Sequence, residues 1–201
     1  MEKLNGKNIV VYDTEIKNVV DGIKVTWGTK HLMGISVACL FDYLTGDYQV
    51  YFDKDVEQLA NRLNDADLVV GFNTTGFDND VVRSNGGENL LSDHSLKNWD
   101  ILEHSRRSTG WTPKDRFPSG MKLDDHLEAT FGEGFMKTAD GADAPLMFQR
   151  GEIGKLTSYC LADVRREKTL FEHIVQHGWV KTKMHGQKHI DLSLINRALG
   201  Q

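Results

Sequence analysis

The chain has 201 residues, of which 39% are hydrophobic, and it carries a formal net charge of −5. That length and apolar content suffice for one well-buried core, so we expect residues 1–201 to form a single domain. No apolar run approaches the roughly 20 residues that span a bilayer. Neither a membrane segment nor a signal peptide is predicted, and we expect a cytoplasmic protein in which Cys39 and Cys160 stay reduced.

The first part of the chain predicts three strands followed by a helix. Residues 8–16 form an apolar run typical of a strand that is buried on both faces. Residues 33–41 and 48–52 predict two further strands, joined by a turn at 44–47. Apolar side chains then recur at helical spacing through 55–64, which predicts an amphipathic helix.

The rest of the chain alternates short strands with helices. Residues 67–72 and 99–102 predict short apolar strands. Helices are predicted at residues 78–84, 123–131, 153–176 and 192–199, and glycines typical of helix ends (Gly86-Gly87 and Gly178) follow two of them. Three early strands followed by this alternation predict an α/β fold in which helices flank a mixed sheet.

Two segments show no clear periodicity. Within residues 17–32, Asp21-Gly22 could turn a small hairpin, which would leave Trp27 either exposed or folded onto a nearby site. Residues 132–151 hold several glycines, and we expect a long loop or flap there.

The net negative charge is unfavourable for binding nucleic acid, but the basic residues are unevenly distributed. Residues 104–122 carry five cations against Asp115, and the tail from residue 179 carries four cations against Asp191. The cations are Arg106, Arg107, Lys114, Arg116 and Lys122 in the first stretch and Lys181, Lys183, Lys188 and Arg197 in the second. Either stretch could follow a phosphate backbone, and an ordinary solvated surface explains each of them about equally well.

Two acids end the first predicted strand. Asp13 and Glu15 are two residues apart, so their side chains share one face of that strand. Two acids on an otherwise buried strand are unfavourable without partners. A divalent cation is one such partner, while a lysine or arginine, or solvent at the strand end, is the ordinary alternative. Oxygen ligands of this kind suit Mg²⁺ or Mn²⁺.

Asp78 begins a predicted helix after a turn that contains Asn73. Aspartate at this position is favoured by helix capping and by the helix dipole alone, and Asp80 could serve the same purpose. Asn73 is also a common turn residue. By itself this segment therefore favours a structural role over a functional one.

Tyr159 and Asp163 are four residues apart on the longest predicted helix, so they lie on one face about one turn apart. A tyrosine hydroxyl there could orient a water molecule that a metal also holds. Two His-x-x-x-His pairs lie nearer the C-terminus (His173 and His177, His185 and His189). Such pairs can bind zinc, but no carboxylate or cysteine completes a convincing set.

Taken together and in order, the three segments resemble the exonuclease motifs of the DEDD, or DnaQ-like, 3′–5′ exonucleases of the ribonuclease H-like superfamily. Residues 13–15 match the Asp-x-Glu first motif, and residues 73–78 match the Asn-x-x-x-Phe-Asp second motif, also found in proofreading domains of family-B DNA polymerases. Residues 159–163 match the Tyr-x-x-x-Asp third motif. Ser158 stands where another subclass has histidine, which indicates the tyrosine (DEDDy) subclass. The resemblance spans residues 8–175.

The resemblance implies a ribonuclease H-like mixed five-stranded sheet flanked by helices, and phosphodiester hydrolysis with two Mg²⁺ or Mn²⁺ ions. By analogy, Asp13 bridges both ions, and Glu15 and Asp163 hold the ion that activates water. Asp78 is implied to hold the second ion, and Tyr159 to position the attacking water.

The implied substrate is single-stranded nucleic acid with a free 3′ end, with DNA favoured over RNA and nucleoside monophosphates as products. Thr14, Asn73 and Phe77 are expected to contact the terminal nucleotide, where stacking on an aromatic ring would suit any base. A replication or repair protein is compatible as a partner. Two alternatives stay open: an exoribonuclease with the same site, and a non-catalytic module that binds nucleic acid or a partner protein.

Overall fold

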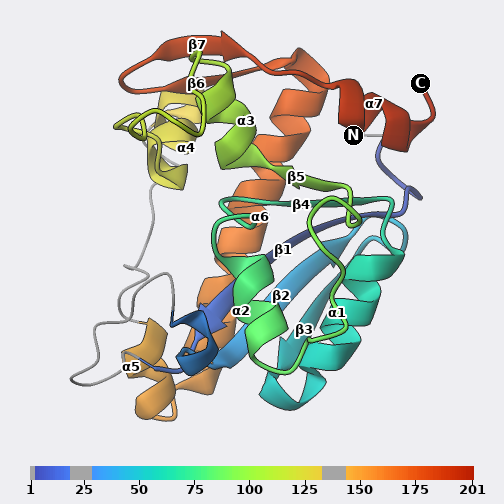
Figure 1. Ribbon diagram of the computed structural model, residues 1–201, viewed down its shortest axis with the longest axis vertical. Coiled ribbons are helices and arrows are strands. Elements are labelled where there is room, and N and C mark those ends of the chain that lie inside the picture. The colour runs from blue at the N-terminus through green and yellow to red at the C-terminus, as the bar shows by residue number, and fades with distance from the viewer. Residues whose placement is uncertain (1–2, 19–28, 133–143) are drawn as a thin grey trace.

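The computed structural model describes residues 3–18, 29–132 and 144–201. At its centre lies a five-stranded mixed sheet in the order β3-β2-β1-β4-β5, as expected for the ribonuclease H-like α/β fold (Figure 1). The strands are β1 (Ile9–Ile16), β2 (Ile35–Asp42), β3 (Asp47–Phe52), β4 (Leu68–Gly71) and β5 (Asn98–Asp100).

The central strand β1 has different neighbours along its two halves. It pairs antiparallel with β2 over nearly its whole length, from Val10 to Ile16. Its parallel pairing with β4 covers only Ile9, Val10 and Val11. The second half of β1 therefore extends beyond its pairing with β4, and there Asp78, the first residue of α2, contacts Thr14.

Helices cover both faces of the sheet (Figure 1). The long helix α6 (Ile153–His177) packs on one face with Val11, and the helices α1 (Val56–Asp65) and α2 (Asp78–Ser84) pack on the other with Val10 and Tyr12. Successive side chains of a strand point to opposite faces. By this alternation Asp13 and Glu15 belong to the α6 face, and Thr14 belongs to the α2 face.

A smaller group of elements lies beyond the β5 end of the sheet (Figure 1). It contains α3 (Ile101–Arg107), α4 (Leu123–Phe131), the hairpin β6–β7 (Trp179–Thr182 and Gly186–His189) and α7 (Ser193–Leu199). The amide of Lys181 in β6 donates a hydrogen bond to the Thr130 hydroxyl in α4 at 3.2 Å. The remaining elements are α5 (Ala144–Gln149) and the single 3₁₀ turns Lys30–Leu32 and Asp53–Asp55.

The predicted helices and the first four strands are confirmed to within two residues at most ends. Gly178 ends α6 as expected: its φ of 72° lies in the left-handed region, and its amide reaches the Ile174 carbonyl at 2.8 Å. The strand predicted at 99–102 is wrong in part, because β5 ends at Asp100 and α3 begins at Ile101.

The other corrections concern short elements. The predicted loop at 132–151 contains α5, and residues 133–143 of it lie outside the described part. The β6–β7 hairpin was not predicted, because its strands carry polar side chains without a clear apolar alternation. Asp21-Gly22 and Trp27 also lie outside the described residues.

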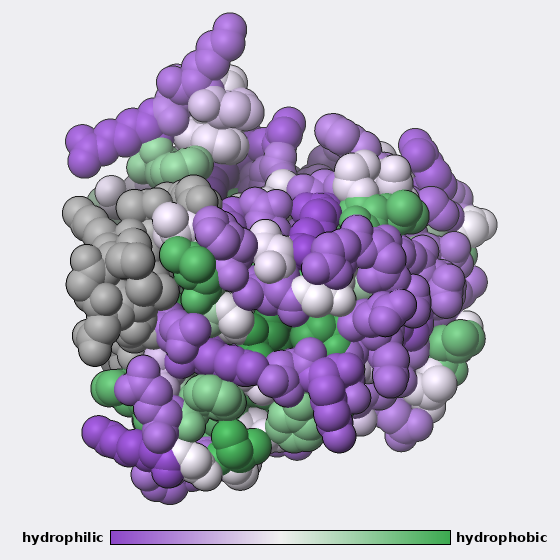
Figure 2. Space-filling model, turned by 60° about the horizontal axis from the view of Figure 1, so that its bottom comes forward, coloured by the Kyte–Doolittle hydropathy of each residue, from purple (hydrophilic) through white to green (hydrophobic). Residues whose placement is uncertain are grey.

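The surface is mostly polar. In Figure 2 hydrophilic side chains dominate the face in view, with separate apolar patches between them. Among the described residues, no helix combines the length and apolar character that crossing a bilayer requires.

Candidate metal centre

Three of the predicted site residues meet at the projecting end of β1. Asp13 and Glu15 point from β1 toward α6, which carries Asp163. One carboxylate oxygen from each of the three residues lies within 4.8 Å of the others. Glu15 and Asp163 are buried, and Asp13 is partly exposed. Because all three donors are carboxylate oxygens, this cluster could hold a divalent metal ion.

Asp78 meets the same strand at Thr14. One of its oxygens, Oδ1, accepts two hydrogen bonds from Thr14, one from the hydroxyl at 2.6 Å and one from the backbone amide at 3.1 Å. Asp78 is therefore held against the residue that lies between Asp13 and Glu15. Asp80 points elsewhere: it pairs with Lys30 at 2.5 Å and Arg83 at 3.1 Å, and its side chain is 47% exposed.

The electrostatics of the centre favour a bound cation. Burial raises the pKa of Asp13 well above its usual range, and the charges of Glu167, Asp78, Glu15 and Asp163 raise it further. Burial raises the pKa of Asp78 to about 6, although the hydrogen bonds from Thr14 oppose that change. Buried carboxylates that repel one another become stable as anions when a cation lies between them. The carboxylate donor set and the mutual repulsion of its charges thus fit a divalent ion.

An arginine neutralises part of the cluster on its outer side. Arg166 lies one turn after Asp163 on α6 and donates to Asp163 Oδ1 at 2.7 Å. Its other terminal nitrogen donates to Asp124 of α4. This bridge joins the acid centre to α4 and directs the Asp163 carboxylate.

Tyr159 lies one turn before Asp163 and is buried. Burial raises the pKa of its hydroxyl above the usual range, and the charges of Asp163 and Glu15 contribute to that shift. The hydroxyl therefore keeps its proton at neutral pH and can act as a hydrogen-bond donor beside the acids.

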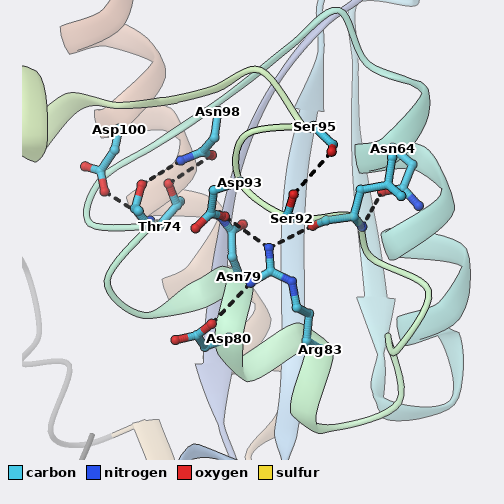
Figure 3. Close-up of polar contacts among 12 residues, drawn as sticks. Asn64, Thr74, Asn79, Asp80, Arg83, Ser92, Asp93, Ser95, Asn98 and Asp100 are labelled. Atoms are coloured by element: carbon cyan, nitrogen blue, oxygen red, sulfur yellow. Dashed lines mark hydrogen bonds and ion pairs between the residues drawn. The ribbon is translucent and has the colours of Figure 1, made fainter.

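The loop between β4 and α2 is fixed by two residues of β5 (Figure 3). Asp100 accepts hydrogen bonds from the amides of Asn73 at 2.9 Å and Thr75 at 3.1 Å. Asn98 donates to the Thr75 hydroxyl at 2.7 Å. Asn73 has a φ of 68°, in the left-handed region that asparagine tolerates better than most residues. These contacts explain how the loop reverses so tightly before Asp78.

Helix α2 has its own support on the far side of this loop (Figure 3). Asn79 accepts a hydrogen bond from the Tyr12 hydroxyl of β1 and donates to Asp93 at 2.5 Å. Arg83 pairs with both Asp80 and Asp93, each at 3.1 Å. The start of α2, and with it Asp78, is thereby anchored to the sheet.

Two buried acids near the centre were not singled out from the sequence. Asp100 also caps α3, accepting from the amides of Leu102 at 2.9 Å and Glu103 at 3.2 Å. Glu167 is 2% exposed, and its Oε2 has no hydrogen-bond partner among the described residues. Glu167 carried a weak signal, since it lies four residues after Asp163, whereas Asp100 fell within a predicted strand.

Neither histidine pair belongs to a metal-ligating cluster among the described residues. The rings of His173 and His177 lie 4.6 Å apart, and the His173 ring packs against Trp179 at 4.3 Å. His185 Nε2 contacts the Ser119 carbonyl at 3.0 Å. No cluster of metal-ligating side chains other than the acids of β1 and α6 occurs in the described part of the chain.

Comparison with known proteins identifies the fold. The chain is similar to the structure of the family B DNA polymerase from the hyperthermophilic archaeon Pyrobaculum calidifontis, with a TM-score of 0.58 and 15% sequence identity. The match covers 83% of this chain and 24% of that polymerase chain. No protein-family model and no curated protein sequence matches the chain. The protein thus shares its fold with part of a DNA polymerase and carries an acidic cluster suited to a metal ion.

Proposed function

We propose that the protein is a metal-dependent 3′–5′ exonuclease that removes nucleoside monophosphates from single-stranded DNA. The observation that carries this proposal is the convergence of Asp13, Glu15 and Asp163, with Asp78 held beside them through Thr14. The likeness to a fold found in a DNA polymerase supports DNA as the substrate.

In this proposal each residue of the centre has a separate task. Asp13, Glu15, Asp78 and Asp163 would hold two Mg²⁺ or Mn²⁺ ions, which activate a water molecule and balance the charge that develops on the phosphate. Arg166 keeps the Asp163 carboxylate aimed toward β1. Tyr159, whose hydroxyl stays protonated, donates a hydrogen bond that orients the attacking water.

The loop before α2 would receive the terminal nucleotide. Asn73 and Phe77 lie on this loop, and Thr14 lies beneath it on β1. Asp100 holds its backbone amides and Asn98 holds the Thr75 hydroxyl, so the loop is ordered before any strand binds. Pre-ordering reduces the entropy lost on binding and would place the scissile phosphate over the acids.

A nuclease assay tests the proposal directly. We expect the wild-type protein with Mn²⁺ or Mg²⁺ to shorten a 5′-labelled single strand one nucleotide at a time from its 3′ end, and to leave a circular single strand intact. Asp13→Ala or Asp163→Ala should abolish the shortening. Asp67→Ala is the matched control, because Asp67 is an exposed acid that pairs loosely with Lys97 at 3.7 Å.

The same assay decides between related activities. Equal shortening by the wild type and both cluster variants would refute the assignment, and cleavage of the circle would indicate an endonuclease. A matched RNA strand reports the sugar preference. Binding of Mn²⁺ in the absence of nucleic acid should raise the melting temperature of the wild type but not of Asp13→Ala, because only the intact cluster binds the ion.

A further inference from the structure

A large cavity opens between the loop before α2 and the segment that joins α3 to α4. Its volume is about 940 Å³. One wall consists of Asn73, Thr75 and Gly76 from the loop, and the opposite wall carries Arg106, Trp111, Phe117 and Lys122. The cavity therefore begins at the loop that leads into Asp78 and ends at the basic stretch between the two helices.

The outer wall presents an aromatic and cationic stack. Phe117 is 62% exposed, which is unusual for a phenylalanine, and its ring centroid lies 5.4 Å from that of Trp111. The Arg106 guanidinium lies 4.2 Å from the Phe117 centroid and 5.8 Å from that of Trp111. An exposed ring backed by a guanidinium offers the surface on which an unpaired base stacks.

This aromatic segment is held in place by its own hydrogen bonds. Asp115 accepts from the amide and the hydroxyl of Thr112, each at 2.8 Å, and its carbonyl accepts from the Trp111 indole at 3.3 Å. The Ser119 carbonyl contacts His185 of the β6–β7 hairpin. The exposed ring of Phe117 thus stands on an ordered segment.

The cations of the wall lack acidic partners among the described residues. Arg106 and Lys122 form no ion pair there, and the buried Nε of Arg106 has no hydrogen-bond partner. Two acids also line the cavity, but both are already engaged: Asp100 by four backbone amides, and Glu103 by Arg107. Positive charge without partners beside an aromatic stack fits the phosphate and base of a nucleotide.

We propose that this cavity binds an unpaired nucleotide of the substrate strand, upstream of the nucleotide at the acid centre. The base stacks on the open face of Phe117, and Arg106 and Lys122 contact the adjoining phosphates. The inference rests on the proposed function, since it takes the acid centre as the position of the 3′ end. Lys122 lies two residues before Asp124, which Arg166 links to Asp163, so this wall continues from that centre.

Binding is measured without catalysis, by fluorescence anisotropy of 5′-labelled dT12 in EDTA. We expect Phe117→Ala to weaken binding by about five- to 150-fold, the range for loss of one stacked base. Phe117→Trp should keep the wild-type affinity, and Phe117→Leu should not, because it retains apolar area without a ring. Tyr48→Ala is the matched control: Tyr48 is a 37% exposed aromatic with Arg165 above its ring at 5.3 Å, on the opposite edge of the sheet.

The phosphate contacts are tested by salt dependence. Lys122→Ala should reduce the slope of log affinity against log salt concentration by about 0.7, the value for one phosphate of a single strand. A slope equal to that of the wild type would remove Lys122 from the site.

A separate readout distinguishes failure of this inference from failure of the proposed function. Hydrolysis of the p-nitrophenyl ester of thymidine 5′-monophosphate with Mn²⁺ reports on the acid centre alone, and Phe117→Ala should leave it unchanged. Wild-type hydrolysis together with unaltered dT12 binding by Phe117→Ala would overturn the inference, leave the proposed function standing and indicate a protein partner for the cavity. Stacking-dependent binding without any hydrolysis would instead overturn the proposed function.

Discussion

Thr14 donates two hydrogen bonds to the same carboxylate oxygen of Asp78, across 64 positions of sequence. Thr14 lies between Asp13 and Glu15 on β1, but its side chain points to the opposite face of the sheet. The threonine therefore couples the fourth acid to the other three through the backbone of a single strand. It has a positioning role in addition to the nucleotide contact expected from its motif.

Removing the Thr14 hydroxyl should change how Asp78 ionises. Thr14→Val keeps the shape and the backbone donor but deletes the 2.6 Å hydrogen bond. We expect the acidic limb of the pH–activity profile to move up by about one unit, because a hydrogen bond to a charged group contributes about 1.5 kcal/mol or more. Thr14→Ser should retain the wild-type profile. An unchanged profile in Thr14→Val would show that the hydroxyl does not act on Asp78.

Asp78 itself should limit the stability of the metal-free protein. Its pKa is raised from 3.8 to about 6, so the folded state binds its proton more tightly than the unfolded state. Stability should therefore fall as the pH rises through that window and stay low above it. We expect Asp78→Asn to raise the free energy of unfolding by about 2–3 kcal/mol at pH 7.5, from the size of the shift.

Urea denaturation in EDTA at pH 4 and pH 7.5 tests this expectation. The gain from Asp78→Asn should be several times larger at the higher pH, because the wild-type aspartate is protonated at the lower one. A gain of the same size at both values would contradict the proposed origin in the buried charge.

Arg166 should be important for both stability and activity. Its side chain is 13% exposed and bridges Asp163 on α6 to Asp124 on α4. Arg166→Met leaves two acids without their cation, and we expect a loss of about 2–4 kcal/mol in the free energy of unfolding. The exposed neighbour Arg165 is the control, and Arg165→Met should cost less than about 0.5 kcal/mol. Similar losses for both variants would show that the bridge adds little.

Asp100 should stabilise both the fold and the conformation of the loop before α2. Its carboxylate accepts from four backbone amides, two in the loop before α2 and two at the start of α3. Asp100→Ala leaves these donors unpaired, and we expect a loss of about 3 kcal/mol from the lost cap and the buried amides. Asp100→Asn keeps one acceptor oxygen, so its free energy of unfolding should lie between those of the wild type and Asp100→Ala. Stability is measured by urea denaturation and site order by nuclease activity.

Local pattern was sufficient for the elements whose apolar periodicity is strong. The apolar run of β1 and the helical spacing along α6 each predicted their element, and the Asp-x-Glu and Tyr-x-x-x-Asp spacings placed side chains on the faces that meet. The resemblance of the motifs then predicted the ribonuclease H-like mixed five-stranded sheet. The meeting of the acid-bearing faces of β1 and α6 could therefore be predicted without knowing the structure of the loops between them.

Elements that depend on helix capping or on contacts distant in sequence could not be predicted from local apolar periodicity. At 99–102 the apolar residues favoured a strand throughout, but the Asp100 side chain caps the following amides and a helix begins. The polar strands β6 and β7 form because they pair with each other and pack on α4. The burial of Glu167 depends on the whole sheet, and no spacing within α6 distinguishes it from an exposed glutamate.

Glu167 is a buried acid near the metal centre, and its charge should destabilise the metal-free protein. Burial raises its pKa well above the usual range, with contributions from the charges of Asp78 and Asp163. The Oε2 atom lies beneath Gly71, where an added Cβ would stand 3.6 Å from it. A raised pKa in the folded state means that stability falls as the pH rises above the ordinary range of glutamate. Glu167→Gln keeps the shape without the charge, so it should match the wild type at pH 4.5 and melt higher at pH 9. Glu172→Gln is the control and should lower the melting temperature at pH 9, because Glu172 pairs with Lys168 at 2.7 Å. A lower melting temperature of Glu167→Gln at pH 9 would show that the carboxylate is stabilised by partners and is not merely buried.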